Sequence, residues 1–149
     1  MKRAGFTMIE LIFVIVILGI LAAVAIPKLA ATRTDAKISK DASDVATALA
    51  DMGAYYTAQG KFGTVGEMTN VKFVTAQDGT TDAKDTNVSG NDVYFNDSAD
   101  TSCLHFTGTS DGNLTITSDS NATPECKGLN TAVADMEKTH TFGGSNVSY

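Results

Sequence analysis

The chain has 149 residues and a formal net charge of −6, and hydrophobic residues make up 43% of it. This length fits one domain with an appendage. The acidic balance, without a cluster of basic residues among aromatics, argues against direct nucleic-acid binding. The two histidines and two cysteines lack the spacing of a metal motif, and no nucleophile–base pair or phosphate loop stands out. Neither an enzyme nor a cofactor is therefore expected.

The apolar residues concentrate near the N-terminus. Phe6 to Ile26 spans 21 residues, and every residue from Leu11 to Ile26 is apolar or glycine. As a helix this segment would be about 30 Å long, the thickness of a bilayer core. Lys2 and Arg3 precede it, which favours a cytoplasmic N-terminus and places the polar remainder across the membrane, in an oxidising space.

Two ordinary explanations compete for this segment, a secretory signal peptide and a plain membrane anchor. Ala22 to Ala25 could supply the small residues of a signal-peptide cleavage site, but the apolar stretch is long and a helix-forming stretch follows it. A plain anchor explains the hydrophobicity and leaves Glu10 unexplained, because a lone carboxylate is costly in hydrocarbon.

A short basic leader ends in Gly5, and Phe6, three further residues and Glu10 follow it. This pattern resembles the class III signal of type IV prepilins and pseudopilins. The resemblance implies that a prepilin peptidase cuts between Gly5 and Phe6 and methylates the new Phe6 amine. The subunit would wait in the inner membrane, and an assembly platform there would then insert it into a homo-oligomeric helical filament that is periplasmic or extracellular.

The same resemblance gives Glu10 a role in assembly. In the apolar core of a filament its carboxylate would pair with the Phe6 amine of a neighbour or of its own subunit, because an unpaired buried charge is costly. Gly19 and Pro27 fall where many family members have residues that soften the helix, which implies local unwinding between them. The alternative is that glycine is common in membrane helices and that Pro27 marks the membrane exit.

After Pro27 the helix is predicted to continue to Gln59, with Gly60 as its stop. Apolar residues recur at spacings of four and three along one face of this part. They are Ile38, Ala42, Val45, Leu49, Met52 and Tyr56. Tyr55 and Tyr56 are expected to pack in the core or on the helix surface, with electron conduction as the alternative.

Residues 60–91 are predicted to form a polar, surface-exposed connection with one short apolar stretch at Val71–Val74. Strands are predicted at Asp92–Phe95, Cys103–Gly108 and Asn113–Ser118, and the last two are joined by a tight turn at Ser110–Gly112. Their alternating apolar residues would cover the helix.

Lys127–Lys138 is predicted as a short helix, and residues 140–149 as a last strand or tail. The expected fold is therefore α+β and pilin-like, with a long N-terminal helix packed on a small antiparallel sheet. Its parts are a leader at 1–5, a membrane or filament-core half-helix at 6–27, an amphipathic half-helix at 28–60 and a globular head at 61–149.

Cys103 and Cys126 are the only cysteines, so in a periplasm they can pair in one way only. A C-terminal disulfide loop resembles the one that bounds the variable region of many type IV pilins, and it favours a pilin over a major pseudopilin. Two free buried thiols are the alternative.

Asp85, Asn87 and Ser89 alternate before a glycine as in the first half of an EF-hand calcium loop. The closing glutamate of that loop is missing, so these residues are an incomplete calcium candidate, and a solvated loop is the alternative.

The expected function is structural: a subunit of a type IV pilus or pilus-like filament that polymerises through its N-terminal helix. A pseudopilin of a type II secretion system and a minor pilin with an adhesin role are the alternatives. Removing Lys2 and Arg3 with the leader would take the side-chain charge from −6 to −8, so the head surface is expected to be acidic.

Overall fold

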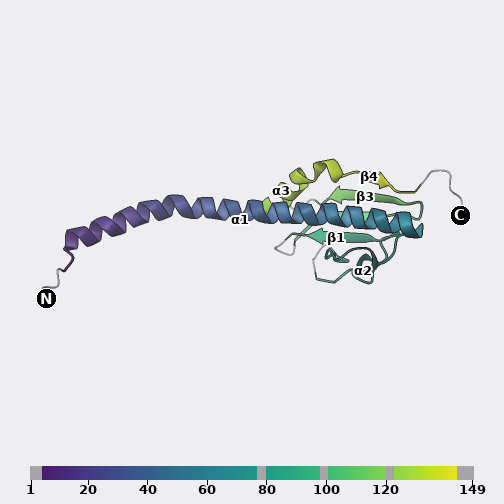
Figure 1. The fold of residues 1–149 in the computed structure, drawn as a ribbon, viewed down its shortest axis with the longest axis horizontal. Helices are drawn as coiled ribbons and strands as arrows, with labels where there is room; N and C mark the ends of the chain where they lie inside the picture. The colour runs from purple at the N-terminus through teal and green to yellow at the C-terminus, as the bar shows by residue number, and fades with distance from the viewer. Residues whose placement is uncertain (1–4, 77–79, 98–100, 120–122, 144–149) are drawn as a thin grey trace. The chain divides into compact units, whose positions relative to one another are not determined.

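The computed structural model describes residues 5–76, 80–97, 101–119 and 123–143. Its elements in chain order are α1 (Met8–Gln59), α2 (Val65–Met68), β1 (Asp92–Asn96), β2 (Ser102–Gly108), β3 (Asn113–Ser118), α3 (Pro124–Ala132), the 3₁₀ helix η1 (Ala134–Met136) and β4 (Thr139–Thr141) (Figure 1). The chain forms two compact units, Met1–Asp35 and Ala36–Tyr149. The predicted α+β layout is confirmed.

Helix α1 runs without a break through Pro27 and ends where the sequence predicts. Gly60 follows it with φ +69°, and the Gly60 amide donates to the Tyr56 carbonyl at 2.7 Å. A left-handed glycine of this kind is the common way to end a helix, because glycine has no Cβ to clash there.

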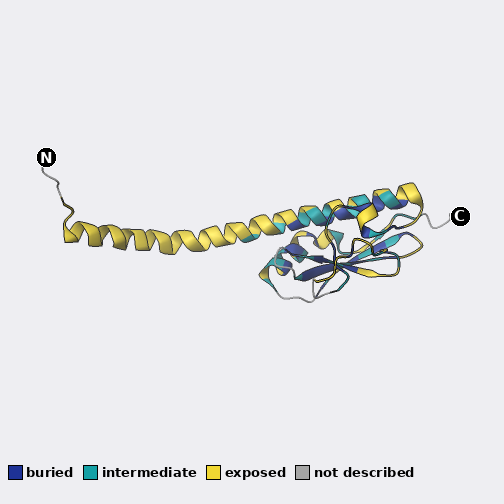
Figure 2. Ribbon diagram, turned by 90° about the horizontal axis from the view of Figure 1, so that it is seen from below, coloured by how far each residue is buried: buried dark blue, intermediate teal, exposed yellow. Residues whose placement is uncertain are grey.

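In the first unit every described side chain from Gly5 to Arg33 is exposed (Figure 2). This segment contains the first half of α1, a helix long and apolar enough to cross a membrane. None of its described apolar side chains is therefore buried within the same chain. A surface of this size needs a bilayer or other copies of the chain around it.

In the second unit four antiparallel strands lie in the order β1-β2-β3-β4. The three predicted strands are present, each within one residue of its predicted bounds. The turn between β2 and β3 uses Gly112 at φ +83°, and its amide donates to the Thr109 carbonyl at 3.1 Å. The alternation of apolar and polar residues directs Leu104, Phe106, Leu114 and Ile116 into the core.

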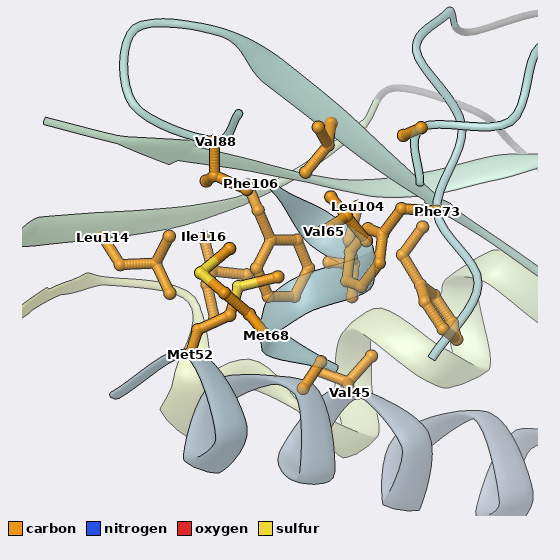
Figure 3. Packing of buried hydrophobic residues seen from close by; sticks show 14 of the residues in the cluster. Val45, Met52, Val65, Met68, Phe73, Val88, Leu104, Phe106, Leu114 and Ile116 are labelled. Atoms are coloured by element: carbon orange, nitrogen blue, oxygen red, sulfur yellow. The ribbon is translucent and has the colours of Figure 1, made fainter. Parts of the chain in front are cut away.

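The second half of α1 packs on this sheet through Val45, Ala48, Met52 and Tyr56, all of them buried. Figure 3 shows Val45 and Met52 pointing from the helix towards Phe106 and its neighbours on the strands. The predicted apolar face is thus present, although its centre also includes Ala48 and the buried Asp41. Tyr56 packs against Phe62 with ring centroids 4.8 Å apart, as expected for a core tyrosine.

The prediction of an exposed connection between Gly60 and β1 is wrong. This stretch forms α2, and its backbone pairs with itself and with β1, as in the Val74–Tyr94 bridge. Seven apolar side chains in the described part of this stretch are buried in the core: Phe62, Val65, Met68, Phe73, Val74, Ala83 and Val88. They occur singly or in pairs along the sequence, so no helix or strand period marks them.

The region after β3 differs slightly from the prediction. Helix α3 begins earlier, because Thr123 caps it by accepting the Cys126 amide on its side-chain oxygen at 3.2 Å, and Pro124 follows at the first helical position. It ends at Ala132, and η1 and β4 follow. The rest of the predicted tail, residues 144–149, lies outside the described residues, as do Lys2 and Arg3 of the leader.

Candidate functional site

The Gly5–Phe6 bond lies just before the first turn of α1. Gly5, Phe6 and Thr7 have no regular secondary structure, and the helix begins at Met8. Phe6 is 88% exposed, and no atom lies within 4 Å of the position that a Cβ on Gly5 would take. A peptidase needs an accessible, non-helical peptide bond, and this junction has both properties.

Glu10 closes a hydrogen-bonded cap at the start of α1. Its Oε2 accepts the Thr7 backbone amide at 2.8 Å and the Thr7 hydroxyl at 2.7 Å. In return the Glu10 amide donates to Thr7 Oγ1 at 3.3 Å. This reciprocal arrangement is a capping box, in which two otherwise unpaired amides of the first turn find acceptors. Glu10 therefore has a local role in the precursor that the sequence analysis missed, although the Thr-x-x-Glu spacing could have revealed it.

The cap also fixes where the Glu10 carboxylate lies. It is held against Thr7, the residue next to Phe6, so cleavage after Gly5 would create an amine beside it. A positive charge at the N-terminus of a helix is unfavourable, and a nearby carboxylate offsets it. The hydrogen bonds thus tie the Glu10 carboxylate to the residue that follows Phe6.

Gly19 and Pro27 both lie inside the continuous helix. Pro27 has no amide to donate, so the Ala23 carbonyl loses its usual helical partner. An added Cβ on Gly19 would meet nothing within 4 Å among the described residues outside its own stretch of helix. Unwinding between the two remains a prediction.

A disulfide joins Cys103 on β2 to Cys126 on α3, in keeping with the expected pairing. Both residues are fully buried. The buried carboxylate of Asp97 lies beside them, with its Oδ2 3.8 Å from Cys126 Sγ. Because the two sulfurs are bonded to each other, this group does not serve as a metal site.

The calcium candidates lie on the connection between α2 and β1. Asp85 and Asn87 are exposed and Ser89 is half-buried. The Asn87 side-chain oxygen accepts the Ser89 amide at 2.8 Å, and its side-chain amide donates to the Phe62 carbonyl at 3.3 Å. Asn87 thus forms an Asx turn that shapes the loop, which supports the solvated-loop alternative. Calcium binding remains a prediction.

A comparison with known protein families matches residues 1–26 to the prokaryotic N-terminal methylation motif. Comparisons with curated proteins and with solved structures find no match. The motif and the apolar helix together suit a precursor anchored in the inner membrane, and they indicate a structural subunit rather than an enzyme. The predicted resemblance is confirmed: the N-terminus of this chain is the class III signal of type IV pilins and pseudopilins.

Proposed function

We propose that this chain is the structural subunit of a type IV pilus or pilus-like filament. A prepilin peptidase cleaves it between Gly5 and Phe6 and methylates the Phe6 amine, and an inner-membrane platform then assembles it through α1. The observation that carries the proposal is the exposed apolar segment from Phe6 to Ile26, which lies within the matched methylation motif and holds a single carboxylate, Glu10.

Pairing of Glu10 with an amine accounts for transfer of the apolar helix from the bilayer into a filament. In both surroundings the new Phe6 amine and the Glu10 carboxylate are costly to bury alone. Paired across two subunits they neutralise each other, and the pairing fixes the axial offset between neighbours. Both Thr7 donors bond Oε2 of Glu10, so that Oε1 can face an amine of another subunit.

A pseudopilin of a secretion system is the alternative, since the motif is common to both groups. The Cys103–Cys126 bridge favours the pilin, because a disulfide loop near the C-terminus resembles that of many type IV pilins. The acidic head argues against DNA as a direct ligand, because DNA carries the same sign of charge.

The test replaces Glu10 with valine in a strain that has no other copy of the subunit. Glu10→Val should still be cleaved after Gly5, since the junction lies outside the helix. It should remain in the membrane and fall at least about a hundredfold in the sheared surface fraction, because leaving a buried charge unpaired costs about 3–5 kcal/mol. Asp35→Val is the matched control, since it removes another exposed carboxylate of α1. Normal filaments from Glu10→Val would contradict the proposal.

A further inference from the structure

The charges of the mature chain are strongly segregated. Between residues 28 and 40 the sequence has four basic residues and one acidic residue, a net charge of +3. From residue 41 to the C-terminus it has fifteen acidic and five basic residues, a net charge of −10. We call residues 28–40 the basic segment. Its charged residues are Lys28, Arg33, Asp35, Lys37 and Lys40.

Three of the four cations of the basic segment have no ion-pair partner among the described residues. All four of its basic residues are exposed. Lys40 pairs with Asp44 at 2.5 Å and lies 3.9 Å from Asp41, but among the described residues Lys28, Arg33 and Lys37 form no ion pair. Three exposed cations on one helical stretch repel one another unless an anionic partner lies near them.

The membrane surface is a poor partner for most of this segment. The headgroup layer outside each face of the bilayer core is roughly 5–8 Å thick. Arg33 is seven residues beyond Ile26, which is about 10 Å along a helix, and Lys37 and Lys40 are further along still. The backbone of Lys28 is therefore level with the lipid headgroups, whereas the backbone of the later three lies beyond them.

A second copy of the chain has the complementary charge. Its head, residues 61–149, has twelve acidic and five basic residues, a net charge of −7, and heads brought together in a polymer repel one another unless cations lie between them. Resting on the filament proposed above, we propose that the basic segment of one subunit docks against the acidic heads of neighbouring subunits. The contact would set which faces of two copies meet, as charge complementarity does at other interfaces.

The first experiment compares two charge reversals of equal size. Lys28→Glu with Arg33→Glu changes the basic segment, and Lys127→Glu with Lys138→Glu changes two exposed lysines of the head by the same amount. We expect the first variant to lose at least about fivefold in sheared filaments and the second to lose less than about twofold. Cleavage at Phe6 and protease resistance of the head confirm that each variant is exported and folded.

Each other result overturns the inference. Equal losses in both variants would mean that net charge alone matters, and normal filaments from the first variant would mean that the segment has no partner. If the first variant instead loses membrane retention of the processed subunit, lipid is the partner. A wild type that yields no sheared filaments would contradict the proposed function itself. Failure of the filament proposal is thus distinguished from failure of the docking inference.

A second measurement identifies the partner directly. Filaments assembled from a mixture of normal and ¹⁵N-labelled subunits are treated with a carbodiimide, which joins lysines to carboxylates in contact. Mixed-isotope peptides that link Lys28 or Lys37 to acidic residues after position 40 are expected. If these lysines form only cross-links in which both peptides carry the same isotope, the contacts lie within one subunit and the inference is overturned.

Discussion

Removing the Cys103–Cys126 disulfide should destabilise the head without affecting membrane insertion. The bridge ties β2 to α3 across a sequence separation of 23 residues. In the chain-entropy model a loop of this size contributes about 3 kcal/mol, because the bridge restricts the unfolded chain. For a small domain with a urea dependence near 2 kcal/mol/M, the unfolding midpoint should fall by about 1.5 M.

The assay uses the full-length protein in detergent and a short protease pulse at each urea concentration. Oxidised wild type is compared with the double variant Cys103→Ser/Cys126→Ser. Reductant should lower the wild-type midpoint to that of the double variant and leave the double variant unchanged, which serves as the control. Equal midpoints for the oxidised wild type and the double variant would refute the reasoning.

Three further changes test local features of the fold. Gly112→Ala should lower the urea midpoint more than Gly60→Ala. Both glycines have positive φ, but only at Gly112 would the new Cβ lie 2.4 Å from a tyrosine ring. Equal shifts of the two midpoints would count against the packing of this ring on Gly112. At the start of α2 the Thr64 amide donates to Glu67 and holds the pKa of this carboxyl below its ordinary value. The stability that this bond contributes is present above the unfolded pKa and is lost as pH falls through the folded pKa. Glu67→Gln should therefore flatten the acid limb of a plot of urea midpoint against pH, and an unchanged plot would contradict this helix cap. Thr7→Val should speed amide hydrogen exchange in the first turn of α1 without blocking cleavage, and unchanged exchange would show that the cap does not stabilise that turn.

The sequence predicts those parts of the fold that follow a regular period. The apolar face of α1, the stop at Gly60 and the alternating residues of β2 and β3 are of this kind, and all are present. The two cysteines could be paired because two cysteines allow only one connection within the chain. These signals are local, or involve only two residues, so one sequence is enough to find them.

The connection between α1 and β1 could not be predicted in this way. Phe62, Val65 and Val88 enter the core from loops and a single helical turn, so their spacing follows the shape of the core rather than a helical or strand period. Their burial depends on tertiary packing. The strand bridges in this region involve single residue pairs, which a pattern search does not detect.

At the candidate site, the sequence identifies the residues but not how they are held. The sequence pattern predicts roles for Gly5, Phe6 and Glu10, while the structure adds that Thr7 binds the Glu10 carboxylate and that the Gly5–Phe6 bond precedes the helix. The Glu10 carboxylate thus has one observed role, as a helix cap, and one proposed role, as the counter-charge for the Phe6 amine.

The measurement that tests the central claim most directly is the intact mass of the subunit in a sheared surface fraction. The account predicts a chain that begins at N-methylated Phe6 and is two hydrogens lighter than the reduced form, because of one disulfide. A processed chain that occurs only in the membrane fraction would favour the pseudopilin alternative. An intact leader beginning at Met1 in native cells would contradict the account.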